Sequence, residues 1–184
     1  MPITPSQTVG PFFSLGLLGP RWAVGIDETV PGPRIHIDGR VLDQDGEPVI
    51  DALIEAWQAD AQGRYRRLGS ASPQHNDRFT GFIRIGTDAG GRFTFETIRP
   101  GAVRQADGML HAPHVNLGIF ARGLLKRLHT RLYFPDEPLN QTDPVLALVP
   151  AARRSTLIAT AAGPGGFAFD LRLSGNGETV FFEC

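Results

Sequence analysis

The sequence predicts an all-β fold, an antiparallel β-sandwich with short helical segments and an extended N-terminal leader. Several short stretches alternate apolar and polar residues with a period of two, and Asp-Gly or Gly-Gly turns separate them. In RIHIDGRVLDQDGEPV, for example, Ile35, Ile37 and Val41 lie on one face before an Asp-Gly turn. Short strands at this spacing favour a sandwich over an architecture of alternating strands and helices.

The remaining predicted elements follow in order along the chain. The further strands are ALIEAWQAD from residue 52, GRFTFETI from 91, HVNLGIFARG from 114, KRLHTRLYF from 126, GFAFDLRLSG from 166 and the terminal ETVFFEC. One interruption is predicted to be helical, because Asp143 is a candidate N-cap before Pro144. Apolar residues at helical spacing then continue through PAARRSTLIATAA, so we expect this helix to end near Gly163.

The length and composition indicate one domain without covalent cross-links. A chain of 184 residues can bury one sizeable core, about 70% of the surface that its unfolded form exposes. We therefore predict a single domain over residues 1–184, in which residues 1–33 form a proline-rich arm lying on another surface. Cys184 is the only cysteine, so no intrachain disulfide can form and a reducing cytoplasm is expected.

The charge distribution excludes two classes of partner. The chain has 18 basic and 19 acidic residues in a mixed pattern, which gives a formal net charge of −1. Without a basic stripe or a polybasic anchor, we expect no nucleic acid and no membrane surface as a partner. The N-terminal stretch has an apolar run broken by Gly and Pro, which indicates neither a secretion signal nor a spanning helix.

The stretch LHAPHVNLGIF raises the question of a metal site. His114 and Asn116 are two residues apart in a predicted strand, so their side chains point to one face. Two histidines at this spacing would hold a metal well, whereas the neutral amide of Asn116 is a poor ligand. The alternative is that the two side chains hydrogen-bond to each other or to the backbone inside the sandwich.

Six stretches spread over nearly the whole chain resemble the intradiol ring-cleavage dioxygenases, the non-haem ferric enzymes that open catechols. They are TPSQTVGPFFSLGL, GRVLDQDGEPVIDALIEAWQADAQGRY, GRFTFETIRPG, APHVNLGIFARG, LHTRLYFPDE and GETVFF. In this family two tyrosinates and two histidines hold the iron, and the anionic phenolate oxygens suit hard Fe(III). The resemblance implies an aromatic ring-cleaving oxidoreductase built on a β-sandwich.

Two of the four ligand positions implied by the resemblance carry a residue that cannot replace the ligand. Tyr65 and His114 fall where the first tyrosine and the first histidine are expected. Val103 stands in place of the second tyrosine, Asn116 in place of the second histidine, and His111 roughly in place of a family arginine. The resemblance therefore implies a degenerate metal site, with no metal ligand and no catalytic residue on this chain.

The heteromeric members of the family have a chain of this kind, the α subunit, beside a related β subunit that carries the Fe(III). The resemblance implies αβ pairs in a larger oligomer, in which protocatechuate and O₂ react on the β subunit to give 3-carboxy-cis,cis-muconate. This chain would complete the substrate pocket with Thr8, Gly10, Pro11 and Phe12 of its arm and with Arg131. Gly10 allows close backbone approach, Phe12 offers an apolar wall, and the guanidinium of Arg131 suits a carboxylate.

Two other functions stay open from the sequence. The chain could be a stand-alone β-sandwich module for binding or carrying a ligand, or a homomeric dioxygenase acting alone. A different metal centre would need His111, His114, His129 and Asp77, and a bend at Pro113 to bring the first two histidines together. Motifs of hydrolases and nucleotide-binding proteins are absent from the sequence.

The carboxylates around LIEAWQAD are a weaker candidate for acid–base chemistry. Glu55 and Asp60 flank Trp57, but a strand leaves Asp60 near the following turn. We therefore expect a buried hydrogen-bond network or a solvated strand end here in place of acid–base chemistry, and a core position for Trp57.

Overall fold

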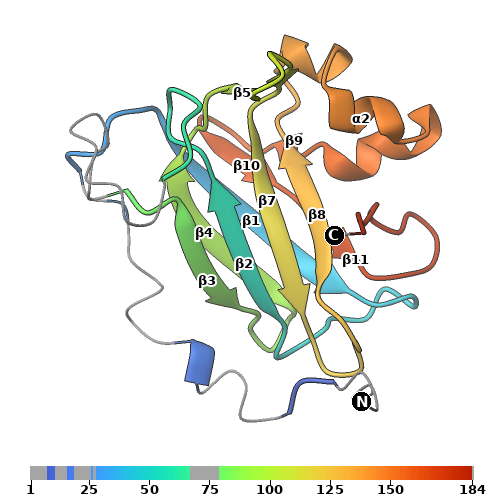
Figure 1. The fold of residues 1–184 in the computed structure, drawn as a ribbon. Helices are drawn as coiled ribbons and strands as arrows, with labels where there is room; N and C mark the ends of the chain where they lie inside the picture. The colour runs from blue at the N-terminus through green and yellow to red at the C-terminus, as the bar shows by residue number, and fades with distance from the viewer. Residues whose placement is uncertain (1–7, 11–15, 19–25, 27, 67–78, 184) are drawn as a thin grey trace, which may run out of the picture.

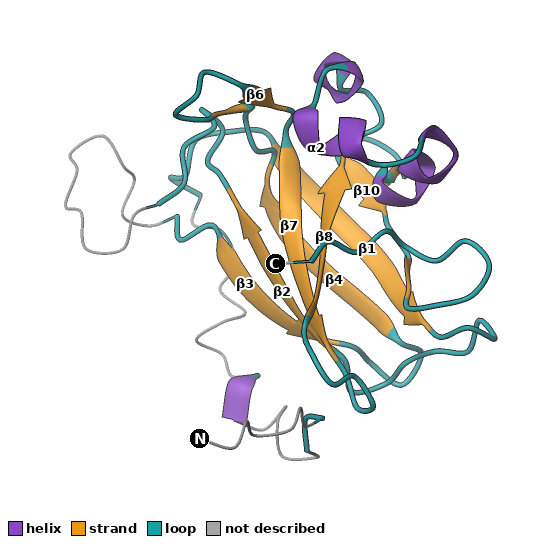
Figure 2. Cartoon of the chain, turned by 45° about the vertical axis from the view of Figure 1, so that its right-hand side comes forward, coloured by secondary structure: helices purple, strands orange, loops and turns teal. Residues whose placement is uncertain are grey.

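The computed structural model of the chain describes residues 8–10, 16–18, 26, 28–66 and 79–183 (Figure 1). Two β-sheets pack face to face, and short helices lie together beside one end of the strands (Figure 2). The predicted all-β sandwich is confirmed by these two layers.

The first sheet is built around its longest strand. Its members are β1 (Arg34–Leu42), β4 (Arg92–Ile98), β9 (Thr160–Ala161), β10 (Gly166–Ala168) and β11 (Leu171–Arg172). β1 pairs antiparallel with β4 but parallel with β10 and β11. The sheet is therefore mixed, not antiparallel throughout as predicted, because the chain returns from the helical layer to the end of the sheet at which β1 begins.

The second sheet carries the positions that the sequence singles out. It has the order β3 (Phe82–Gly86), β2 (Leu53–Gln58), β7 (His114–Phe120) and β8 (Leu128–Tyr133). All its neighbouring strands are antiparallel. A small hairpin precedes β7 and consists of β5 (Val103–Arg104) and β6 (Leu110–His111).

The main core lies between the two sheets because alternate side chains of each strand point inward. Ile37 of β1 and Leu117 and Ile119 of β7 have no exposed surface. In β7 the alternate positions are also covered, since His114 is 2% exposed and Asn116 is 9% exposed. This strand is therefore buried on both faces, and its outward polar side chains must find partners within the protein.

The helical layer is shorter than the sequence predicts. Asp143 is the N-cap of α2 (Pro144–Leu148), as expected, and its side chain accepts hydrogen bonds from two backbone N–H groups. The prediction of one helix to about residue 162 is wrong, because Pro150 cannot continue the helix and Val149 before it is extended, with ψ of 130°. The chain then forms a 3₁₀ helix, η2 (Ala151–Leu157), and a second one, η1 (Pro138–Gln141), precedes α2.

Both ends of the chain contact the second sheet. The terminal stretch predicted as a strand forms only an isolated bridge, between Phe182 and His129. In the N-terminal arm, Thr8 Oγ1 accepts a hydrogen bond of 2.7 Å from the backbone N–H of Gly123, at the turn between β7 and β8. No helix among the described residues is long and apolar enough to cross a membrane.

Candidate functional site

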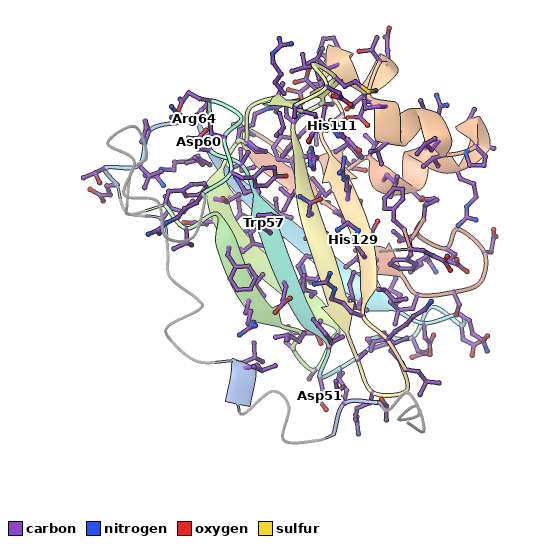
Figure 3. All side chains as sticks on the ribbon, viewed as in Figure 1. Asp51, Trp57, Asp60, Arg64, His111 and His129 are labelled. Carbon is purple, nitrogen blue, oxygen red and sulfur yellow. The ribbon has the colours of Figure 1, made fainter. Side chains whose placement is uncertain are left out.

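The candidate site lies on the outward face of the second sheet. Strand register brings three side chains into one row, since Trp57 pairs with Asn116 and Asn116 pairs with Arg131. The next row joins His114 and Tyr133. Figure 3 shows Trp57 over β2, in the middle of this face. Residues far apart in the sequence meet here because paired residues of neighbouring strands point to the same side.

A tight turn after β2 returns the chain to this face and positions Tyr65. Asp60 Oδ1 accepts hydrogen bonds of 2.9 Å from two backbone N–H groups within the turn. Gly63 in the same turn has a φ of 77°, a conformation that other residues rarely adopt. The ring of Tyr65 then lies 4.6 Å, centroid to centroid, from the ring of Trp57.

Three of the side chains that the resemblance aligns with iron ligands meet at the Tyr65 hydroxyl. Tyr65 Oη lies 3.1 Å from His114 Nε2, and His114 Nδ1 lies 2.7 Å from the carbonyl oxygen of Ala112. Because Nδ1 donates its proton to that carbonyl, Nε2 must accept the phenolic proton. Asn116 Nδ2 donates to Tyr65 Oη at 2.8 Å and to the carbonyl oxygen of Trp57 at 3.2 Å. Tyr65, His114 and Asn116, here called the YHN cluster, therefore form one neutral hydrogen-bonded group centred on the Tyr65 hydroxyl.

A guanidinium lies beside the YHN cluster. Arg131 Nη1 donates to His111 Nδ1 at 3.0 Å and lies 3.4 Å from Tyr133 Oη. An arginine N–H can only donate, so His111 accepts through Nδ1 and its ring is neutral. The sequence places His111 where the family has an arginine, and the structure shows that β8 supplies a guanidinium to the same region.

A buried carboxylate joins the site to the helical layer. Asp143 is 1% exposed and accepts four hydrogen bonds. Its donors are Tyr133 Oη at 3.1 Å and the backbone N–H groups of Ala112, Val145 and Leu146 at 2.8 to 2.9 Å. Its lone pairs are therefore engaged within the chain, and it reaches Arg131 only through the hydroxyl of Tyr133.

Burial keeps the rings of the site uncharged, and the nearby guanidinium adds to this effect for the two histidines. Burial, followed by the positive charge of Arg131, lowers the pKa of His114 to about 4. The same two causes lower the pKa of His111. Burial raises the pKa of Tyr65, although its bond with Asn116 opposes this shift. At neutral pH the site therefore holds neutral rings and one cation.

These residues do not fit ferric iron. The phenol of Tyr65 keeps a raised pKa, the His114 lone pair is engaged by the phenolic proton, and Asn116 directs its N–H groups toward the same oxygen. Val103 adds only a buried hydrocarbon, 6% exposed. Arg131 adds positive charge where a metal would need anionic ligands.

The alternative metal centre also lacks support from the described residues. The rings of His111 and His114 are 6.1 Å apart, closer than a straight strand would allow. Asp77, the carboxylate of that hypothesis, lies outside the described residues. Within the described ranges, no three His, Cys, Asp or Glu side chains form a group that could hold a metal ion.

The predicted pocket residues lie in two places. Arg131 is beside the YHN cluster, whereas Thr8 is at the far turn between β7 and β8, with Gly10 two residues further along the arm. The structure therefore does not bring the two groups together within this chain. Pro11 and Phe12 lie outside the described residues.

The predictions for the residues around β2 had different outcomes. Of the two alternatives expected around Glu55, the structure supports the network, because the Glu55 carboxylate lies 2.7 Å from Arg84 Nη2 and 3.7 Å from Arg127 Nη1. The prediction that Trp57 is a core residue is wrong, since it is 45% exposed. Alternation fixes which residues share a face but does not identify the core face, and Trp57 points away from the core.

Sequence reasoning missed the roles of Tyr133 and Asp143 in the site. Asp143 was recognised only as an N-cap, from the Asp-Pro pair. Its contacts with Ala112 and Tyr133 depend on how the helical layer folds over the sheet, which no local pattern indicates.

Comparison with known proteins identifies the protein family of this chain. A family model described as "Dioxygenase" matches residues 21–175. The chain belongs to the intradiol dioxygenase family.

Three of the similar proteins are chains of protocatechuate 3,4-dioxygenases. The alpha chain from Burkholderia cepacia is 41% identical and the comparison covers 98% of this chain and 96% of the relative. The alpha chain from Pseudomonas putida is also 41% identical, over 100% of this chain and 97% of the relative. The beta chain from Burkholderia cepacia is 37% identical, over 80% of this chain and 67% of the relative.

Solved structures of the family share the fold. The dioxygenase domain of a dioxygenase and carbohydrate-binding protein fusion from Streptomyces sp. SirexAA-E is 29% identical. It superposes with a TM-score of 0.63 and covers 94% of this chain and 98% of that one. The 3-chlorocatechol 1,2-dioxygenase from Rhodococcus opacus 1CP is 25% identical, with a TM-score of 0.66 over 84% of this chain and 65% of that one.

Proposed function

We propose that this chain is the non-metal α subunit of a heteromeric protocatechuate 3,4-dioxygenase. One observation carries the proposal: the positions that the resemblance aligns with iron ligands hold a neutral hydrogen-bonded cluster beside a guanidinium, in a chain whose relatives include alpha chains at 41% identity. A chain that cannot hold ferric iron acts in ring cleavage only through a partner that does. The partner is a related β-type chain, which carries the Fe(III) and binds the catechol.

The chain itself contributes part of the substrate pocket. We assign this role to Thr8, Gly10, Pro11 and Phe12 of the arm and to Arg131. The hydrogen bond that the Thr8 side chain accepts from the backbone N–H of Gly123 supports an arm that follows the protein surface toward a neighbour. We propose that residues 1–184 act as one domain with residues 1–33 as this arm, that several αβ pairs assemble, and that the assembly works in the cytoplasm.

The reaction that the heteromer performs is intradiol cleavage. Fe(III) held by the partner would supply the activation of the catechol toward O₂. Cleavage between the two hydroxyl-bearing carbons of protocatechuate, with both oxygen atoms of O₂ incorporated, would give 3-carboxy-cis,cis-muconate. The charge of Arg131 is suited to hold the ring carboxylate, and Phe12 is suited to exclude water from the ring.

Co-expression with a related chain that has two tyrosines and an intact His-x-His pair tests this function. Iron content and protocatechuate-dependent O₂ uptake are measured for this chain alone and for the purified complex. We expect iron and turnover only in the complex, and Arg131→Ala to raise KM there while Arg122→Ala leaves it unchanged. Arg122 is the matched control because it is exposed and pairs with Asp51.

Two results would contradict the proposal. Stoichiometric iron and turnover from the isolated chain would identify a homomeric dioxygenase. Failure of the two chains to associate, with no iron in either preparation, would favour a stand-alone binding module.

A further inference from the structure

We propose that Asn176 is a site of spontaneous covalent modification, at which the backbone nitrogen of Gly177 converts the side-chain amide into a carboxylate. The inference goes beyond the proposed function, because it needs neither the partner nor its iron. It rests on three features of the described residues: an Asn-Gly pair in an exposed turn, a glycine N–H without an acceptor and a side-chain amide without a partner. The product is a mixture of aspartate and isoaspartate at position 176.

The Asn-Gly pair lies in the loop that follows β11, at the red end of the chain in Figure 1. The backbone N–H of Glu178 donates to the carbonyl oxygen of Gly175 at 3.2 Å, so Asn176 and Gly177 are the two central residues of a turn. Gly177 has a φ of 74°, which glycine adopts without strain. A Cβ placed on Gly177 would contact only Arg172 Cδ among the described atoms, at 3.7 Å, so the space around this glycine is open.

Both groups that react are free of hydrogen bonds within the part of the chain that the structure describes. Asn176 is exposed, and neither its side-chain amide nor the backbone N–H of Gly177 bonds to another described residue. A backbone nitrogen attacks only after it has given up its proton, and a bonded N–H must first leave its acceptor. The nucleophile and the carbon that it attacks are therefore adjacent in the chain, and neither has to break a contact.

Other pairs of an acidic or amide residue with a following glycine lack this combination. They are Asp38-Gly39, Asp45-Gly46 and Asp107-Gly108. All three begin with aspartate, whose ionised carboxylate resists a nucleophile more strongly than an amide does. The N–H of Gly46 donates to the carbonyl oxygen of Asp43 at 3.3 Å, and the N–H of Gly108 donates to that of Gln105 at 3.0 Å. The first pair lies within β1, where the backbone is held in the sheet.

The other described asparagines are held by their neighbours. Asn116 Nδ2 donates to Tyr65 Oη at 2.8 Å, and its backbone lies in β7 between two paired strands. Asn140 Nδ2 donates to the carbonyl oxygen of Phe134 at 2.7 Å. Both are followed by a residue with a side chain, which shields the next backbone nitrogen. They are therefore internal references for the reaction rate at Asn176.

The reaction needs only water and a base from the solvent. The Gly177 nitrogen loses its proton and attacks Cγ of Asn176, so that an N–Cγ bond forms and the Cγ–Nδ2 bond breaks. The amide nitrogen takes up a proton and leaves as ammonia, and a cyclic imide remains. Water then opens either carbonyl of the imide and gives aspartate or isoaspartate. No group is oxidised or reduced in these steps.

The isoaspartyl product lengthens a loop whose ends are fixed. Thr179, 1% exposed, donates through its backbone N–H to the carbonyl oxygen of Arg172 at 3.0 Å and accepts from the N–H of Arg172 at 3.0 Å through Oγ1. Beyond Thr179, the N–H of Phe182 donates to the carbonyl oxygen of His129 in β8 at 2.7 Å. An extra main-chain carbon between fixed ends strains these bonds. Isoaspartate therefore loosens the C-terminal segment from β8, whereas aspartate at the same position leaves the loop length unchanged.

The test incubates the purified full chain in mildly alkaline buffer and follows it by isoelectric focusing and by peptide mapping with mass spectrometry. We expect a more acidic form to accumulate with first-order kinetics, faster at higher pH because the attacking nitrogen must lose its proton. The new carboxylate should map to position 176, in both its aspartyl and isoaspartyl forms. Asn116 and Asn140 in the same sample should stay unmodified over that time.

Matched variants separate the attack by Gly177 from general hydrolysis. Gly177→Ala should slow the reaction several-fold or more, because a methyl group beside the nitrogen hinders its approach to Cγ. Gly163→Ala is the control, since Gly163 lies in another exposed turn with a φ of 89° and should leave the rate unchanged. Asn176→Ser removes the amide and should abolish the new acidic form, which tests the site independently if Gly177→Ala does not fold.

Hydrogen exchange tests the structural consequence. The isoaspartyl fraction, separated by ion exchange, should lose protection at the N–H groups of Thr179 and Phe182. Asn176→Asp carries the same charge without the longer main chain, so it should keep that protection. Equal protection in both chains would show that the product does not loosen the C-terminal segment.

The remaining outcomes decide the site itself. A folded chain that yields no acidic form, or an equal rate in Gly177→Ala, would overturn the inference. Modification of Asn116 or Asn140 at the rate of Asn176 would show that the open turn does not select the site. None of these measurements uses the partner, so an active heteromer whose chain shows no acidic form would sink this inference alone.

Discussion

Two polar groups on the same sheet face differ in how their charges are paired. Around Glu55, one carboxylate lies between the guanidinium groups of Arg84 and Arg127. Around the YHN cluster, Arg131 is surrounded by neutral rings and has no carboxylate of its own among the described residues. The carboxylate of the first group is paired with guanidinium groups, whereas within the described residues Arg131 donates only to neutral acceptors.

The difference follows from how each group is tied to the rest of the fold. Glu55 and Arg84 are direct neighbours in the register of β2 and β3, so two strands suffice to form their ion pair. The YHN cluster needs the turn after β2, both strands β7 and β8, and the helical layer through Asp143. We therefore expect larger losses of stability from changes in the second group.

The largest effect is expected for Asp143→Ala. The change removes the N-cap of α2 and leaves Tyr133 and the N–H of Ala112 without their acceptor in the interior. An N-cap contributes about 1 kcal/mol and each buried group left unpaired costs about 1–3 kcal/mol. Urea unfolding should show a loss of at least about 3 kcal/mol, the sum of the smallest of these contributions. A loss below about 1 kcal/mol would mean that Asp143 does not join the helical layer to the site.

His114 should make stability depend on pH. Its pKa is lowered from 6.5 to about 4 in the folded chain, chiefly by burial, so the unfolded chain binds more protons between these values. The free energy of unfolding is therefore undiminished above about pH 6.5 and falls as the pH drops toward 4, by about 3 kcal/mol from this residue.

Unfolding of the unaltered chain and of His114→Gln at several pH values measures that contribution. Glutamine retains an acceptor for the Tyr65 hydroxyl but does not titrate in this range. The difference in stability between the two chains should shrink between pH 7 and pH 4. A constant difference across this range would contradict a buried neutral imidazole at this position.

Much of the second sheet could be predicted from the sequence, because strand alternation is local information. The stretches around Leu53, His114 and Leu128 all form strands where the pattern indicates. The strand over residues 82–86 was not predicted, since FIRIG shows no clean alternation and all its residues are partly buried. The length of the helical segment was also missed, because apolar spacing through Pro150 suggested a continuity that proline prevents.

The site could be predicted only in part, for a related reason. The resemblance identified Tyr65, His114 and Asn116 as one group, and the structure shows that they do bond to one another. It could not place Arg131 against His111, because that contact depends on the register of β8 and on the hairpin before β7. Contacts across strands and layers are not encoded in any short stretch of sequence.

A smaller loss is expected for Glu55→Gln. The change leaves Arg84 and Arg127 facing each other without the carboxylate that they share. Because Glu55 and Arg84 keep only 14% and 20% of their side chains exposed, the loss should be about 1–2 kcal/mol. Added salt should reduce the difference from the unaltered chain. Equal stability of the two chains at low salt would show that the Glu55 carboxylate does not stabilise the neighbouring Arg84 and Arg127.

The smallest effect is expected at the exposed pair between Arg122 and Asp51. Their side chains are 57% and 60% exposed, and the distance between the charged atoms is 3.3 Å. Ion pairs of this kind contribute about 0–1 kcal/mol, so Arg122→Gln should change the unfolding free energy by about 0.5 kcal/mol or less. A loss as large as that of Glu55→Gln would mean that the exposed fraction of a charged side chain does not predict how much its ion pair stabilises this protein. The contrast between the partly buried Glu55 group and the exposed Arg122 pair would then not follow from how much water reaches each charge.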